Sequence, residues 1–240
     1  MLSNKITNLI KFKKFNVPKF KYYNLTNWNS NKVKILADIK KNFKKKVIIR
    51  SAALDEDSSY TNAGKYTSIL SVNPSDKNKL VQSINEVINS YKKNQKSQNS
   101  FIVQSMIVKP KISGVIFTKD PNSGFPSTIV NYSKNVSTDL ITSGLITGNQ
   151  IVYLNHKKIK LNNKLIINLK KNIDKILKIS KKKNLDIEFC IDKNNRFILL
   201  QCRELKINNK IKYDLSALYQ NYFYFYRKLK KVLPSNNILH

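Results

Sequence analysis

The sequence of 240 residues has only two cysteines, only 14 acidic residues and no apolar run near the roughly 18 residues of a membrane-spanning helix. Its two thiols, Cys190 and Cys202, lie in apolar segments and indicate a reducing compartment, which we take to be the cytoplasm. The chain also lacks a Walker A motif and a dinucleotide-binding glycine fingerprint. These absences argue against a membrane span, a disulfide framework and two common modes of phosphate binding.

The scarcity of acids leaves a large positive charge, because 45 lysines and arginines give a formal net charge of +31. Such a field attracts nucleotides, nucleic acids and acidic proteins. Nearly all of this charge is lysine, spread from end to end and accompanied by many asparagines and isoleucines, as codon drift in an AT-rich genome produces. We therefore expect that nucleic acid is not the partner, and keep a polyanion-binding protein as an alternative.

Length and composition allow one substantial domain or two small lobes, since 41% of the residues are hydrophobic. Helical and strand patterns follow one another up to about residue 212, which predicts a domain over residues 1–212. Residues 213–240 predict a helical tail with an aromatic stripe at Tyr219, Tyr222, Phe223 and Tyr226. A stripe of this kind is typical of a packing face against the same domain or another chain.

A β-hairpin is predicted over residues 185–203, where two alternating apolar runs flank a polar turn. Asn194 and Asn195 suit the two positive-φ positions of a type I′ turn, which would place Lys193 opposite Arg196. Because side chains alternate along a strand, this register predicts one polar face. That face would carry Asp186, Glu188, Gln201 and Arg203.

The predicted polar face has the chemistry of a metal and phosphate site. Glu188 would lie opposite Gln201, roughly 5 Å away, and a carboxylate beside an amide oxygen suits Mg²⁺. Arg203, opposite Asp186, suits a phosphate. An ordinary hairpin with a solvated polar face remains the alternative at this point.

A second candidate site follows a short apolar run at residues 47–49, which predicts a buried strand. Arg50 comes next and leads residues 51–59, whose small hydroxyl side chains and backbone N–H groups can hold phosphate. Alternatively, Arg50 pairs with one of the three acids at residues 55–57. Lys5 lies at the start of a predicted helix, where a cation opposes the helix dipole, so a nearby anion would account for it.

Four segments, in this order, resemble one family. Val47 to Asp57, followed by Ala63-Gly64, is similar to V-x-V-R-S-S-A-x-x-E-D and A-G-Q. Val103 to Ile107 resembles V-Q-x-M-V, and Ser113 to Gly124 resembles S-G-V-x-F-T-x-D-P-x-x-G. Asp186 to Arg203 resembles a D-I-E-F/W-A hairpin that ends in L-Q-x-R-P. These motifs resemble those of the N-terminal ATP-binding domain of phosphoenolpyruvate synthase and pyruvate phosphate dikinase.

This resemblance implies an α+β fold of the ATP-grasp type, with two lobes, mixed or antiparallel sheets and, after them, the C-terminal aromatic helix. It also implies ATP and Mg²⁺ as ligands. Lys5 and Arg50 would contact the phosphates, Glu188 and Gln201 would hold Mg²⁺, and Arg203 would reach the transferred phosphate. The strand at Gln104, Met106 and Ile107 would lie along the adenine.

The chain departs from the family's pattern at several positions. Asp139 stands where the family has the glutamate of G-L-G-E, and would replace it with a side chain one methylene shorter. Glu204 replaces the proline of R-P, and Lys65 replaces the glutamine of A-G-Q. These departures leave open a weakened use of ATP or a different phosphoryl acceptor.

The family's catalytic histidine has no counterpart in this sequence. The two histidines, His156 and His240, lie outside any motif like that of the phosphohistidine, and we interpret His156 as a surface residue. The resemblance thus implies a phosphotransferase that passes a phosphoryl or pyrophosphoryl group from ATP to a histidine on a partner chain. The alternatives are a nucleotide-binding or scaffold module without turnover and a polyanion-binding protein on the same fold.

Overall fold

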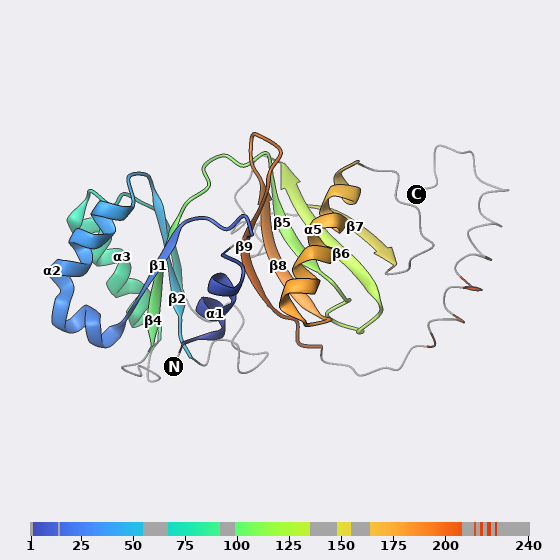
Figure 1. Cartoon of the computed structure of the whole chain (residues 1–240), viewed down its shortest axis with the longest axis horizontal. Coiled ribbons are helices and arrows are strands. Elements are labelled where there is room, and N and C mark those ends of the chain that lie inside the picture. The colour runs from blue at the N-terminus through green and yellow to red at the C-terminus, as the bar shows by residue number, and fades with distance from the viewer. Residues whose placement is uncertain are drawn as a thin grey trace. The chain divides into compact units, whose positions relative to one another are not determined.

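The computed structural model describes residues 2–13, 15–54, 67–91, 99–134, 148–154 and 164–207, with five isolated residues of the tail. The elements are α1 (Asn4–Lys11), β1 (Phe20–Asn24), α2 (Leu25–Asn42), β2 (Val47–Ala52), β3 (Ser68–Val72), α3 (Lys77–Asn89), β4 (Ser100–Ser105), β5 (Ile112–Phe117), β6 (Ser127–Lys134), β7 (Asn149–Leu154), α5 (Lys164–Ser180), β8 (Leu185–Ile191) and β9 (Phe197–Glu204) (Figure 1). This mixture of helices and sheets confirms the predicted α+β class. Most of the predicted helix at 213–240 lies outside the described residues.

The strands form two sheets. The first has four strands in the order β1-β4-β2-β3, and its neighbouring strands are all antiparallel. The second has five strands in the order β7-β6-β5-β8-β9 and ends with the predicted hairpin, β8–β9. No helix among the described residues is long and apolar enough to cross a membrane.

The four-stranded sheet has a different cover on each face. On one face, Ile49 and Val103 pack into the main core with residues of α2 and α3, which lie together beside the sheet (Figure 1). On the other face, Ala52 and Ile102 pack against Ile6 and Leu9 of α1. Opposed residues of paired strands share a face, and so do alternate residues of one strand. The register Arg50 to Ile102 and Ile48 to Gln104 therefore puts Arg50 and Gln104 on the face of α1.

The N-terminal segment ties β9 to this face. Helix α1 begins after Ser3, whose side chain accepts a bond from the backbone N–H of Ile6 at 3.5 Å, a typical N-cap. Asn8 Nδ2 donates to the carbonyl of Cys202 at 2.8 Å. Asn16 donates through Nδ2 to the carbonyl of Phe197 at 2.9 Å and accepts from the N–H of Leu199 at 2.9 Å. These contacts fix the position of β9 relative to α1.

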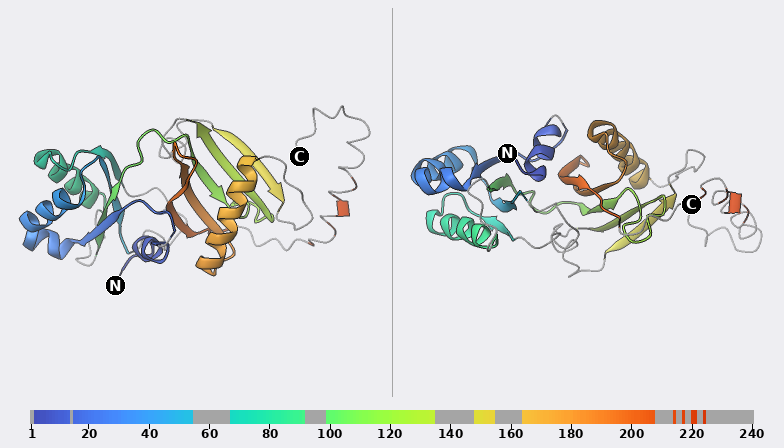
Figure 2. Two further views of the ribbon diagram at one scale, coloured as in Figure 1. Left: turned by 45° about the horizontal axis from the view of Figure 1, so that its top comes forward. Right: turned by 90° about the horizontal axis from the view of Figure 1, so that it is seen from below.

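The chain divides into two compact units. The first comprises Met1–Val115, Tyr132–Asn149 and Ile187–Arg203. The second comprises Ile116–Asn131, Gln150–Asp186 and Glu204–His240. Figure 2 shows α5 of the second unit, in orange, running alongside strands. Its spacing predicts Leu165, Leu169, Ile173, Ile176 and Leu177 as the inward stripe. Leu169, Ile173 and Ile176 are buried, whereas Leu165 and Leu177 are only half-buried and Ile166 is buried instead.

The turn of the β8–β9 hairpin differs from the prediction. Of the two asparagines only Asn195 has a positive φ, 59°, so the predicted type I′ turn is wrong. Asp192 donates its N–H to the carbonyl of Arg196 at 3.1 Å, so Asp192, not Lys193, faces Arg196. The register from which the pairs Glu188–Gln201 and Asp186–Arg203 were predicted is therefore wrong at the turn. The Asp192 carboxylate accepts from the N–H groups of Asn194 and Arg196, both at 2.9 Å. Aspartate can bond its own following backbone in this way, and here it sets a three-residue loop. Cys190 and Cys202 are both buried, and no disulfide joins them in the described part of the chain.

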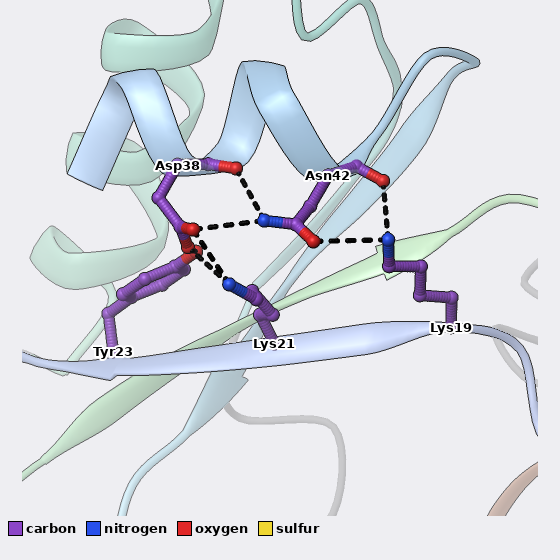
Figure 3. A network of polar contacts seen from close by, with 5 residues as sticks. All are labelled: Lys19, Lys21, Tyr23, Asp38 and Asn42. Atoms are coloured by element: carbon purple, nitrogen blue, oxygen red, sulfur yellow. Dashed lines mark hydrogen bonds and ion pairs between the residues drawn. The ribbon is translucent and has the colours of Figure 1, made fainter. Parts of the chain in front are cut away.

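A polar network joins β1 to α2 (Figure 3). The Asp38 carboxylate accepts from Lys21 Nζ at 2.7 Å, from the Tyr23 hydroxyl at 2.6 Å and from Asn42 Nδ2 at 2.9 Å. Burial pushes the pKa of Asp38 upward, but the hydrogen bonds from Lys21 and Tyr23 outweigh it, so this pKa lies below its ordinary value of 3.8. Lys19 Nζ extends the network by donating to the carbonyl of Asn42 at 2.8 Å.

Replacing Asp38 is expected to weaken the fold in a pH-dependent way. We expect Asp38→Ala to lower the free energy of unfolding near neutral pH by about 1 kcal/mol, a charge-assisted value discounted for solvent screening. Because the folded pKa is depressed, the contribution is present above 3.8 and disappears as the pH falls through the folded pKa. Urea unfolding of both proteins at neutral and acidic pH measures this difference. A difference that stays constant down to strongly acidic pH would contradict it.

Candidate functional site

Arg50 of β2 is the centre of a cluster of predicted site residues within the first unit. Its Nη1 donates to Gln104 Oε1 at 3.2 Å and to the carbonyl of Leu200 at 3.4 Å. Its Nη2 donates to Glu188 Oε2 at 3.1 Å and also to Gln201 Oε1. The guanidinium of Arg50 thus links β2 to three other strands, β4, β8 and β9.

The burial of this cluster decides between the two interpretations of the hairpin. Gln201 is only 5% exposed and Asp186 only 7%. The ion-paired side chains of Arg50 and Glu188 are 12% and 16% exposed. The polar face is therefore not an ordinary solvated one. Arg50 takes Glu188 as its acidic partner, whereas residues 55–57, the alternative partners, lie outside the described residues.

The oxygens of Glu188 and Gln201 converge on one point, because the single atom Nη2 of Arg50 reaches both. A carboxylate and an amide oxygen are hard donors of the kind Mg²⁺ prefers, so the pair fits a divalent cation. The described residues contain no group of three or more histidine, cysteine or acidic side chains that could hold a metal. A cation at this point would therefore complete its ligand shell with phosphate oxygens or water.

Gln104 has an unusual hydrogen-bonding state. It is 1% exposed, and its Oε1 accepts from Arg50. Arginine can only donate, so the amide oxygen must face Arg50 and the amide nitrogen must point away from it. That nitrogen, Nε2, is buried without a hydrogen-bond partner among the described residues. An unpaired buried donor costs about 1–3 kcal/mol, so an acceptor that reaches Nε2 would stabilise this site.

Lys5 is placed beside Arg50 by helix α1. It is 7% exposed, and its Nζ donates to the carbonyl of Ser51, the residue after Arg50, at 3.0 Å. The two residues predicted to contact phosphate are therefore close together: Lys5 of α1 bonds to Ser51, which directly follows Arg50 on β2. Asn8 lies one turn after Lys5 on the same face of α1, and its side chain holds β9 through the carbonyl of Cys202.

The remaining predicted site residues lie near this cluster or outside the described part of the chain. Arg203 is half-buried on β9, two residues after Gln201. Met106 and Ile107 are half-buried directly after β4, and Met106 donates its N–H to the carbonyl of Lys46 at 3.0 Å. Their predicted places at the transferred phosphate and the adenine stay predictions. Asp139 and His156 lie outside the described residues, as does Lys65.

Comparison with solved structures shows which fold this chain has. An L-amino acid ligase from Bacillus licheniformis is similar with a TM-score of 0.51 and 12% identity, over 87% of this chain and 44% of that one. A D-alanine-D-alanine ligase from Coxiella burnetii gives 0.47 and 8%, over 88% and 49%. These chains are ATP-grasp ligases, and at such identities the first shows the fold alone: an ATP-grasp fold, as predicted. The chain spans about half the length of these ligases.

One family model matches part of the sequence. Residues 29–135 match the model of the AMP/ATP-binding domain of pyruvate phosphate dikinase. This match confirms the resemblance inferred from the motifs and supports binding of ATP. It contains Arg50 and Gln104, whereas the hairpin with Glu188 and Gln201 lies beyond it and is joined to them by the contacts of Arg50. No curated protein matches the sequence.

Proposed function

We propose that this chain binds Mg-ATP and transfers a phosphoryl or pyrophosphoryl group to a histidine on a partner chain. This is the first half-reaction of phosphoenolpyruvate synthase and pyruvate phosphate dikinase. The observation that carries the proposal is the contact of Arg50 with Gln104, Glu188 and Gln201. It assembles, in one compact unit, the residues that the family resemblance assigns to phosphate and metal.

In this proposal the side chains act by position and charge. Arg50 and Lys5 bind the phosphates of ATP, and Arg203 meets the group in transfer. Glu188 and Gln201 would hold Mg²⁺, which when bound neutralises charge on the phosphate oxygens. Fixed cations aimed at developing negative charge stabilise the transition state without reorganising during the reaction. Neither His156 nor His240 lies in a phosphohistidine-like motif, so neither is the proposed acceptor.

Transfer is tested by supplying the acceptor as a separate protein. The chain is incubated with Mg²⁺, labelled ATP and the isolated phosphohistidine domain of a pyruvate phosphate dikinase. We expect label on that domain that is stable in alkali and labile in acid, as for phosphohistidine. The same domain with its catalytic histidine replaced by asparagine should stay unlabelled. If the chain binds ATP but neither this domain nor any protein expressed with the chain becomes labelled, the transfer step is contradicted.

A nucleotide-binding module without turnover is the second candidate. It is favoured by the sequence around Asp139, where the family's glutamate motif has changed. The two candidates differ in their products, because pyrophosphoryl transfer from ATP leaves AMP and phosphoryl transfer leaves ADP. Formation of AMP or ADP that depends on the histidine acceptor supports the enzyme, and intact ATP after prolonged incubation supports the binding module.

A further inference from the structure

The guanidinium of Arg50 lies where a cation between Glu188 and Gln201 would lie. Its Nη2 donates to both oxygens at once, so a single positive group already satisfies the two donors assigned to Mg²⁺. Two cations cannot share this point, because at such separations their mutual repulsion is large in a poorly solvated site. Metal binding and this position of Arg50 therefore exclude each other.

We propose that Arg50 substitutes for the divalent cation until the metal arrives, and that metal entry releases its guanidinium to the phosphates. We call this the guanidinium-for-metal exchange. It rests on the proposed function for its second half, the encounter with phosphate. Its first half, competition between Arg50 and a metal ion for Glu188 and Gln201, stands on the contacts alone.

Gln104 holds one side of the Arg50 guanidinium during the exchange. Nη1 of Arg50 is held by Gln104 Oε1 and by the carbonyl of Leu200, and neither contact uses the oxygens that the metal needs. When Nη2 leaves Glu188, the guanidinium can remain attached through Nη1. A phosphate oxygen would then accept from the released Nη2, and another could accept from Gln104 Nε2, which is buried without a partner among the described residues. We therefore assign Gln104 as a positioning residue for Arg50.

The exchange makes the metal and the nucleotide help each other to bind. Metal alone must displace a hydrogen-bonded charge, so its affinity is reduced. ATP without metal meets an arginine already paired with Glu188. Each ligand favours the same released state of Arg50, and two ligands that favour one state bind cooperatively and reciprocally.

The exchange is tested with Mn²⁺ alone, which prefers the same carboxylate and carbonyl oxygens as Mg²⁺ and whose free ion is measured by electron paramagnetic resonance. In the full chain without nucleotide, Arg50→Met should bind Mn²⁺ at least about tenfold more tightly than the wild type, the scale of one hydrogen bond to a charged group. Arg196→Met, which removes the same charge from the hairpin turn, where the side chain is 63% exposed, is the matched control and should change the affinity by less than about threefold.

A second variant protects the test against loss of folding. Arg50→Lys keeps the charge but has a single nitrogen and no planar fork, so it holds the two oxygens less well and should give an intermediate affinity for Mn²⁺. Circular dichroism of each variant checks the fold. Equal affinities of wild type and both folded Arg50 variants, or an equal gain in Arg196→Met, would overturn the exchange. Failure of the proposed function would appear separately, as no ATP binding by the wild type with Mg²⁺.

Discussion

Glu188→Ala is expected to remove the Mg²⁺ dependence of ATP binding and to lower the free energy of unfolding by about 2–3 kcal/mol. The first effect follows because the carboxylate is the only charged donor of the proposed metal site. The second follows because Arg50, 12% exposed, loses its acidic partner, and breaking a buried pair leaves an uncompensated charge. ATP titrations with and without Mg²⁺, and urea unfolding without ligand, measure the two effects.

The matched control for this variant is Glu204→Ala. Glu204 also forms an ion pair, with Lys182 Nζ at 3.1 Å, but both side chains are more than half exposed. Exposed pairs are worth about 0–1 kcal/mol, so this change should leave stability and the Mg²⁺ dependence almost as in the wild type. If Glu188→Ala retains the full Mg²⁺ dependence of ATP binding, the assignment of Glu188 to the metal is wrong.

Arg50→Met is expected to weaken Mg-ATP binding by about 100-fold, as the loss of two hydrogen bonds to charged phosphate oxygens implies. It should also slow transfer at saturating ATP by roughly a thousandfold or more, as removal of a phosphate-stabilising arginine does in other phosphoryl transfers. Calorimetric titration gives the affinity, and single-turnover formation of AMP gives the rate. The same variant should bind Mn²⁺ alone more tightly, so the effects on metal and nucleotide have opposite signs.

Arg196→Met is the control for loss of an arginine. Arg196 pairs with Asp192 at 2.7 Å in the hairpin turn, and its side chain is 63% exposed. We expect its replacement to leave the affinity for Mg-ATP unchanged within about twofold, because an exposed charge away from the cluster is screened. An affinity for Mg-ATP in Arg50→Met equal to that of Arg196→Met would show that Arg50 does not contact the phosphates.

Much of the first sheet and the makeup of the site follow from local sequence patterns. The short apolar run at residues 47–49 predicted the strand β2, because a strand with both faces covered consists largely of apolar residues. The predicted hairpin was correct in its two strands. Its turn was wrong because the carboxylate of Asp192 bonds to the backbone of Asn194 and Arg196, an interaction that competes with the asparagine preference for a type I′ turn.

The connections within the site could not be predicted from sequence patterns. Arg50 and Glu188 are separated by 138 positions, and no periodicity reports how closely two such distant strands approach. The resemblance put both residues in one site but assigned them to different ligands, phosphate and metal. Their direct ion pair, and the unpaired amide nitrogen of Gln104, depend on the side-chain geometry of the folded unit.

Binding of Mg-ATP at the Arg50 cluster is tested most directly by thermal unfolding with and without ATP, each with and without Mg²⁺. A ligand at about 100 times its dissociation constant adds roughly 2.7 kcal/mol to the free energy of unfolding. For a chain of this size that is a rise in Tm of about 5–10 °C. We expect this rise with ATP and Mg²⁺ together, a much smaller one with either alone, and a rise of only about 1 °C in Arg50→Met at the same ligand concentration. An unchanged Tm of the wild type with every nucleotide would contradict it.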